Sequence, residues 1–217
     1  MTLDAQKTQA YFHQRARQFD SLYDEKRDLG YVLNRTFRSA LYKRVALTVQ
    51  EFDDLSNFSV LDVGCGSGRN SVIFAKAGAH RVLGVDFADN MIELANQYGE
   101  QHRVHDTCEF IKQDVLTWSS DERFDIVVAL GVFDYIKDPR ALLSRMAHLS
   151  KAKVIGSFPG LSLVRAPFRK FRYSLRHCPV YFFSRSEIQQ AANDAGLKDL
   201  SIHPAGSSGW MLIARVP

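Results

Sequence analysis

Cysteine is scarce in this sequence, and long hydrophobic runs are absent from it. The three cysteines, Cys65, Cys108 and Cys178, are odd in number, far apart and outside any His/Cys spacing of a metal site. No apolar run approaches the ~18 residues of a membrane-spanning helix, and the amino terminus carries no hydrophobic signal core. We therefore expect free thiols, no bound metal and a cytoplasmic location.

Acidic residues are missing from one stretch in particular. The chain has 28 Lys and Arg against 24 Asp and Glu, a formal net charge of +4. Residues 160–186 contain six basic residues and no acid, so 22 basic and 24 acidic residues remain elsewhere. The positive excess thus lies in one short cluster. Because it does not extend as a basic stripe along the chain, binding to nucleic acid is the less favoured alternative.

The rest of the composition is that of an ordinary globular protein. Apolar residues make up 46% of the chain and charged residues 24%. A length of 217 residues suits one α/β domain with some additional helix.

A glycine-rich turn follows the first strongly apolar run, and it lacks the residues of two common nucleotide-binding loops. Its glycines are Gly64, Gly66 and Gly68. A Walker phosphate loop places Lys after its last glycine, where this chain has Arg69, so that pattern fails. The dinucleotide fingerprint is weakened, because Arg69 or Ser71 stands in place of its third glycine.

What remains is Asp-x-Gly-x-Gly-x-Gly, followed by a second apolar run that ends in Asp86. Glycine permits positive φ and close approach of a ligand to the backbone, and a helix that follows offers unpaired N–H groups. Asp86 lies eighteen positions after Gly68, about the distance at which an acid binds ribose hydroxyls after a βαβ crossover. The alternative role for this Asp is a helix cap.

Four motifs follow one another at the spacings of one enzyme family. They are Leu61–Gly68, Val82–Asp86, Phe110–Val115 with its Asp114, and Phe124–Leu130. Over about residues 58–158 the sequence resembles the class I S-adenosylmethionine-dependent methyltransferases. The conjunction of the four motifs is more specific than any one of them.

Apolar runs alternate with helical patterns from residue 58 onward, which predicts a parallel sheet with helices on both faces and a ligand-binding rim at the strands' carboxyl ends. The resemblance implies an α/β, Rossmann-like, seven-stranded methyltransferase fold, mostly parallel, with an antiparallel last strand beside the fifth. The expected strands are 58–63, 81–86, 107–112, 124–130, 153–158, 197–203 and 209–216. The expected helices are 69–78, ending at Gly78, 88–98, ending before Gly99, 138–149, and 184–196, capped by Ser184 or Ser186.

Two further helices, 11–23 and 31–52, are predicted before the first strand from apolar residues spaced three and four apart. In the resembled family such segments cover the ligand; packing on the sheet is the alternative. We expect one methyltransferase domain, 1–217. Its parts are a helical lid (1–56), a cofactor-binding core (57–158), a basic and aromatic substrate-side insertion (159–183), and a closing helix with a β-hairpin (184–217).

The resemblance implies S-adenosyl-L-methionine as cofactor and S-adenosyl-L-homocysteine as product. Asp86 would accept hydrogen bonds from the ribose hydroxyls, and Asp114 would accept one from the adenine amino group. Asp62 would lie near the methionine amino group. For Asp114 the alternative is an ordinary loop acid, and Phe87 and Met91 could flank the adenine or belong to the core. The implied cofactor-binding residues are Asp62, Gly64, Cys65, Gly66, Gly68, Asp86, Phe87, Met91, Asp114, Val115 and Leu130.

The loop after the fourth strand carries the candidate catalytic residues, Asp134 and Tyr135. Methyl transfer needs alignment, and a base only where the acceptor carries a proton of high pKa. Either residue could instead cap or pad the next helix. The loop lacks the Asp/Asn-Pro-Pro-aromatic sequence of methyltransferases that act on adenine bases or glutamine amides, which favours a small-molecule acceptor.

The basic segment 165–176 is the most individual feature. Its arginines could bind a carboxylate or phosphate of the acceptor, dock on an anionic membrane surface, or form a solvated face. The candidate substrate-binding residues are Tyr11, Arg165, Arg169, Arg172 and Tyr181. Transfer of another group from the same cofactor, and modification of RNA, stay open as rival functions, and the sequence indicates no oligomeric state.

Overall fold

The computed structural model describes residues 44–51, 54–160, 179–205 and 209–217. Seven strands form one sheet in the order β3-β2-β1-β4-β5-β7-β6. The strands are β1 (Ser59–Val63), β2 (Arg81–Asp86), β3 (Cys108–Lys112), β4 (Phe124–Leu130), β5 (Ser150–Pro159), β6 (Lys198–Pro204) and β7 (Gly209–Arg215). The expected seven-stranded Rossmann-like sheet is confirmed.

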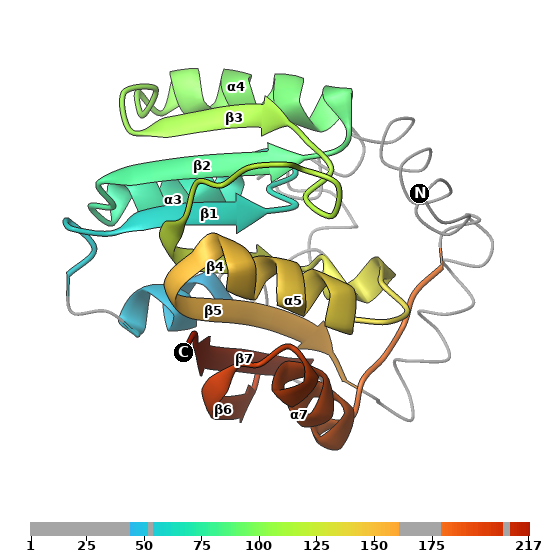
Figure 1. Ribbon diagram of the computed structural model, residues 1–217. Helices are drawn as coiled ribbons and strands as arrows, with labels where there is room; N and C mark the ends of the chain where they lie inside the picture. The colour runs from blue at the N-terminus through green and yellow to red at the C-terminus, as the bar shows by residue number, and fades with distance from the viewer. Residues whose placement is uncertain (1–43, 52–53, 161–178, 206–208) are drawn as a thin grey trace, which may run out of the picture.

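The first five strands run parallel, and β7 is the exception. The ladders of β1 with β2 and β4, of β2 with β3, and of β4 with β5 are all parallel. β7 pairs antiparallel with β5 on one side and with β6 on the other, as predicted for the last strand. In Figure 1 the arrowheads of β1, β2, β3 and β5 point to the same edge, and the parallel ladders of β4 place its end there too. β1, β2 and β4 deliver the candidate site at this edge.

Helices cover both faces of the sheet. They are α3 (Arg69–Lys76), α4 (Asp89–Gln101), α5 (Arg140–Leu149) and α7 (Arg185–Asp194), with a short 3-10 helix, η2 (Phe133–Tyr135). In Figure 1, α5 and α7 lie in front of the sheet and α3 lies behind it. Two hydrophobic clusters correspond to these faces: one contains the apolar side chains of α5 and α7, the other those of α3 and α4.

The alternation of side chains along β1 explains how both layers form from one strand. Val60 packs in the α3 and α4 cluster, whereas Leu61 and Val63 pack in the α5 and α7 cluster. Asp62 falls on the α3 side, where it accepts a hydrogen bond from Ser71 of α3. The acid that the sequence places in a buried strand is thus directed at the start of the first helix.

The predicted end of α4 before Gly99 is wrong, because the helix continues to Gln101. Gly99 is a buried helical residue, and a Cβ on it would lie 3.1 Å from the ring of Phe110. The same ring would lie 2.7 Å from a Cβ on Gly68 and 2.6 Å from one on Gly84. Three glycines therefore form a slot for one phenylalanine, and Gly99 serves packing and not helix termination.

The other predicted ends agree with the structure to within a few residues. α3 ends two residues before Gly78, which has a φ of 96°. Ser184 caps α7 in a capping box with Glu187. β5 begins at Ser150 and not at 153, because Ser150 pairs with Phe124 across an irregularity in the β4–β5 register.

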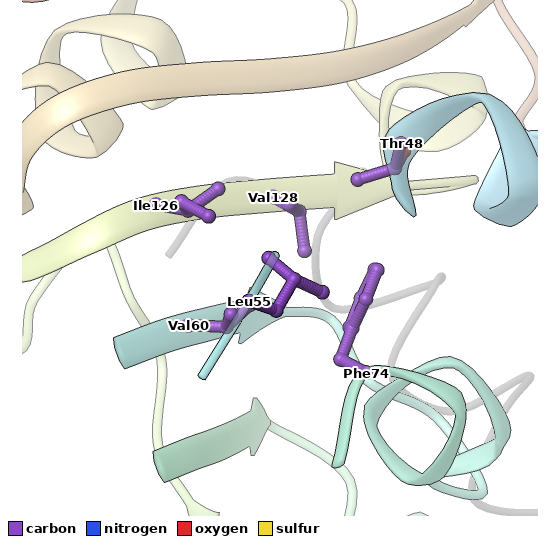
Figure 2. A pocket seen from close by; sticks show the side chains of 6 residues that line it. All are labelled: Thr48, Leu55, Val60, Phe74, Ile126 and Val128. Carbon is purple, nitrogen blue, oxygen red and sulfur yellow. The ribbon is translucent and has the colours of Figure 1, made fainter. Parts of the chain in front are cut away.

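The chain before β1 is described only from residue 44. Residues 44–50 are helical, within the predicted helix 31–52, and the predicted helix 11–23 lies outside the described residues. Val45, Thr48 and Leu55 are buried on the α3 side of the sheet. Figure 2 shows the apolar pocket left there, which is lined by Thr48, Leu55, Val60, Phe74, Ile126 and Val128. None of these residues belongs to the candidate site.

Candidate functional site

The glycine turn after β1 is held against the end of β2. The N–H groups of Gly64 and Cys65 both donate to the Val85 carbonyl, at 2.8 and 3.0 Å. Gly64 has a φ of 66°, and a Cβ there would lie 2.4 Å from Cγ2 of Val132. Backbone conformation and packing both require glycine at this position.

Gly66 differs, because the space beside it is open. Its φ is 55°, and no other atom of the described residues lies within 4 Å of a Cβ placed on it. Its N–H donates to Oδ2 of Asp86 at 3.0 Å, so the turn is joined to the acid that closes β2. The middle glycine therefore keeps a half-buried point of the backbone accessible beside a carboxylate, as a ligand cradle requires.

Asp86 is a buried carboxylate that backbone donors orient. Its Oδ1 accepts from the Ala88 N–H at 2.9 Å, and its Oδ2 from Gly66. Burial raises the pKa of this carboxyl to about 6, although the N–H groups of Ala88, Gly66 and Phe87 oppose the shift. The bond to Ala88 is a local turn before α4 and not the helix cap expected as the alternative, because Ala88 is the N-cap residue and α4 has no side-chain capping bond. Each carboxylate oxygen has further acceptor capacity for a diol.

Asp62 is more deeply buried, with only 1% of its surface exposed. The Ser71 hydroxyl donates to its Oδ2 at 2.6 Å, whereas its buried Oδ1 has no hydrogen-bond partner among the residues that the structure describes. Burial raises the pKa of Asp62 to about 7; the Ser71 bond opposes this rise and the negative charge of Asp86 adds to it. An unpaired buried acceptor is costly, so a donor or a cation is expected to meet Oδ1 when the site is filled.

The loop between β3 and β4 brings Asp114 and Val115 to the same rim. The Gln113 N–H donates to the Asp86 carbonyl at 2.8 Å, which places the loop beside that residue. Oδ1 of Asp114 accepts from the Leu116 N–H at 3.1 Å, while no donor to Oδ2 is found within the described part of the chain. Asp114 therefore keeps one oxygen for an amino group.

The remaining predicted cofactor residues surround these acids. Phe87 is half-buried and Met91 is 1% exposed, and the two belong to one small cluster at the start of α4. Cys65 is buried in the turn, and Leu130 is the last residue of β4. These residues lie at or next to the carboxyl ends of β1, β2 and β4.

The candidate catalytic residues lie in η2, directly after β4. Asp134 is 5% exposed and Tyr135 is half-buried. The Tyr181 N–H donates to the Asp134 carbonyl at 2.9 Å, so a predicted substrate-side residue is bonded to a predicted catalytic one. The ring of Phe133 in η2 stacks on the ring of Phe158 in β5 with centroids 4.0 Å apart, which holds η2 against the sheet.

Four predicted substrate-binding residues, Tyr11, Arg165, Arg169 and Arg172, lie outside the described residues, as does Cys178. Sequence reasoning missed two buried serines. Ser71 holds Asp62, and the hydroxyl of Ser157 accepts from the Gly131 N–H at 2.9 Å at the start of the η2 loop. A serine inside an apolar helix or strand was the available signal, since such a hydroxyl needs a partner.

The donor and acceptor set fits S-adenosylmethionine. Two buried carboxylates suit a ligand that carries an ammonium and a sulfonium group, and the oriented Asp86 suits a vicinal diol. The open backbone at Gly66 leaves room for the ligand's central part. Among the described residues, no three His, Cys, Asp or Glu side chains gather where they could hold a metal ion.

A family model described as a methyltransferase domain matches residues 11–202. The chain belongs to this methyltransferase family. The ubiquinone biosynthesis O-methyltransferase of Coxiella burnetii is 30% identical over 156 residues, which cover 66% of this chain and 64% of that enzyme. The enzyme of the same description from Neisseria meningitidis serogroup C is 33% identical over 99 residues, 45% of this chain and 42% of that enzyme. The methyltransferase thus spans less than two thirds of the length of these curated relatives.

Solved structures support the fold over nearly the whole chain. The magnesium protoporphyrin IX methyltransferase of Synechocystis PCC 6803 with bound S-adenosylhomocysteine superposes with a TM-score of 0.79 at 22% identity, covering 99% of this methyltransferase and 100% of that chain. The same enzyme with bound S-adenosylmethionine gives a TM-score of 0.77 at 20% identity, covering 100% and 99%.

Proposed function

We propose that this methyltransferase transfers the methyl group of S-adenosylmethionine to an oxygen atom of a small-molecule acceptor. The observation that carries the proposal is the pair of buried carboxylates at the glycine turn, one oriented by Gly66 and the other with a buried oxygen unpaired. A cationic ligand with a diol satisfies both at once.

In this proposal Asp86 accepts the ribose hydroxyls and Asp62 faces the amino group, with the Ser71 hydroxyl holding its other oxygen. Asp114 receives the adenine amino group on its free oxygen. The bound donor supplies a methyl group on a positively charged sulfur. The chain's own task is to align the acceptor with that methyl group, which can supply up to ~7 to 11 kcal/mol of the barrier reduction.

An oxygen acceptor is proposed because the curated relatives are described as O-methyltransferases. A phenol or similar acceptor must lose a proton on transfer, and Asp134 is the buried acid of η2, the turn that directly follows β4. Its main chain is fixed by Tyr181 and its neighbour Phe133 is fully buried, so the turn that carries it is rigid. We assign Asp134 as the proton acceptor and Tyr135 as an acceptor-facing side chain.

Other features of the acceptor side stay predictions. Binding of an acidic group or of a membrane surface by Arg165, Arg169 and Arg172 concerns residues outside the described part of the chain. A cytoplasmic location likewise stays a prediction. Within the described ranges, no helix is both long and apolar enough to cross a bilayer.

A direct test uses S-adenosylmethionine labelled in its methyl group. The purified chain is titrated with the donor by calorimetry and then incubated with phenols, carboxylic acids and RNA, and products are identified by mass. We expect donor binding and a product heavier by one methyl group from a small molecule. Label in RNA alone, or a product heavier by an aminopropyl or carboxymethyl group, would replace the proposal by one of its rivals.

A further inference from the structure

Arg145 of α5 hydrogen-bonds the loop that joins β3 to β4. Its Nε donates to the Val115 carbonyl at 3.2 Å, and its Nη2 donates to the carbonyls of Trp118 and, at 3.3 Å, Ser120. One guanidinium therefore holds three main-chain oxygens within six residues of the same loop. The fixed geometry of the guanidinium lets it orient several acceptors together.

This loop has little regular structure of its own. It contains no helix between β3 and β4. Its internal bonds are turns, such as the one at Asp114, whose carbonyl accepts from the Thr117 N–H at 3.1 Å, and a bond from the Glu122 N–H to the Ser120 hydroxyl. Leu116 is 49% exposed, while Val115 and Trp118 pack toward the α5 and α7 cluster. Apolar burial thus fixes the two side chains, and Arg145 fixes the carbonyls beside them.

The held residues are those proposed to meet the adenine. Arg145 binds the carbonyl of Val115, and the Val115 N–H has no acceptor among the described residues, so that donor is available to a ligand. Asp114, directly before it, has one carboxylate oxygen in a turn and one open. The Val115 carbonyl shares a peptide plane with the Leu116 N–H, which is the donor to Oδ1 of Asp114, so rotation of the Val115–Leu116 peptide would move the group that orients the Asp114 carboxylate.

Arg145 is not explained by an ion pair. Among the described residues no carboxylate lies within salt-bridge distance of its guanidinium, although the side chain is half-buried. A charged donor that meets only neutral main-chain oxygens orients those carbonyls. An apolar side chain such as Met could fill the same space but would not orient them.

We propose that Arg145 is a positioning residue that sets adenine selectivity by orienting the Val115–Leu116 peptide, whose N–H holds the Asp114 carboxylate. The inference rests on the proposed function, because it takes the loop to be the adenine site. It assigns to α5, on the opposite face of the sheet from α3 and α4, a part in donor recognition.

The test compares two ligands that differ only at the base. Calorimetry measures the affinities of S-adenosylhomocysteine and S-inosylhomocysteine, in which a carbonyl replaces the 6-amino group, for the wild type, Arg145→Met and Arg145→Lys. We expect the wild type to prefer the adenine ligand by about ten- to a hundredfold, as the loss of a hydrogen bond to a charged group predicts. In Arg145→Met this preference should fall below about threefold, with Arg145→Lys between the two.

Arg140→Met is the matched control on the same helix, because Arg140 bonds Asp138 and no carbonyl of the loop. It should keep the wild-type preference. A merely structural effect of Arg145 would weaken the binding of both ligands equally. An unchanged preference for the adenine ligand in a folded Arg145→Met or Arg145→Lys protein would therefore overturn this inference and leave the proposed function intact. Failure of the wild type to bind S-adenosylhomocysteine would overturn the proposed function and this inference together.

Discussion

The two carboxylates of the proposed donor site are held in different ways. Asp86 accepts main-chain N–H groups on both oxygens, whereas Asp62 is held by Ser71 on one oxygen and, within the described part of the chain, keeps the other unpaired. Asp86 is therefore oriented before any ligand arrives, which suits the directional recognition of a diol. Asp62 keeps the capacity for a strong new contact.

We expect Asp86→Ala to weaken S-adenosylhomocysteine binding about ten- to a hundredfold, because hydrogen bonds to a charged group contribute about 1.5 to 3 kcal/mol. Calorimetry measures the change. Asp89→Ala is the control, since Asp89 is an exposed acid three residues away that pairs with Lys112. Equal affinities of the wild type and Asp86→Ala would remove this residue from the donor site.

Asp134→Asn tests the proposed proton acceptor. We expect kcat to fall by about a hundred- to ten-thousandfold, the usual contribution of general-base catalysis, with little change in the KM for the donor. Asp138→Asn is the matched control in the same loop, because Asp138 is exposed and bonded to Arg140. Similar kcat values in both variants would assign Asp134 a packing role.

At the scale of elements, β3 packs closely against α4 because glycines around Phe110 lack side chains. Phe110 lies against Gly68, Gly84 and Gly99, from a turn, a strand and a helix. A Cβ added to Gly68 or Gly84 would lie less than 3.0 Å from the ring, so the ring is already packed closely against both glycines. It therefore has no room to move away from a side chain added at Gly99. The same ring supports the last glycine of the donor turn, which joins packing to ligand binding.

Gly99→Ala should therefore destabilise the protein, although alanine is the better helix former. Overpacking costs about 1 to 3 kcal/mol, against a propensity gain of about 1 kcal/mol. Urea denaturation measures the free energy of unfolding, and the double variant Gly99→Ala/Phe110→Leu should lose less than the two single variants together. A more stable Gly99→Ala protein would contradict the glycine slot.

Much of this architecture could be predicted from local pattern. The strand before the turn, the order of strands and helices and the antiparallel β7 all follow from hydrophobic periodicity and the family motifs. Gly99 could not be read correctly, because a glycine in a helix looks like a stop until the ring that occupies its space is known. Arg145 was missed for a similar reason, since its partners are main-chain oxygens that have no signature in the sequence.

For the molecule as a whole, the buried acids couple donor binding to pH. Burial raises the pKa of Asp62 from 3.8 to about 7 and that of Asp86 to about 6. The stability linked to the neutral forms is complete below the unfolded pKa and is lost as the pH rises through 6 and 7. A cationic ligand favours the ionised forms, so its binding releases protons in this window.

We expect the affinity for S-adenosylhomocysteine to rise between pH 5.5 and 7.5, while the free energy of unfolding of the ligand-free protein falls. Calorimetry in two buffers of different ionisation enthalpy counts the protons released on binding. In Asp62→Asn the part of this release that belongs to the higher pKa should disappear. Proton uptake on binding, or an affinity that does not depend on pH in the wild type, would contradict the coupling.

The sequence predicts the residues of the donor side of the site better than those of the acceptor side. The acids, glycines and loop of the donor site follow strand ends, so motif spacing places them at one rim. The acceptor is set by side chains on segments that have no such spacing rule, including residues 161–178 outside the described part. Family membership therefore indicates the reaction class more closely than the substrate.

A crystal structure of the chain with bound S-adenosylhomocysteine tests the central claim most directly. The account predicts ribose hydroxyls within hydrogen-bond distance of Asp86, the ligand's ammonium group beside Asp62, the backbone of Gly66 against its central part, and the adenine amino group at Asp114. Ligand bound elsewhere, with Oδ1 of Asp62 still unpaired, would contradict it.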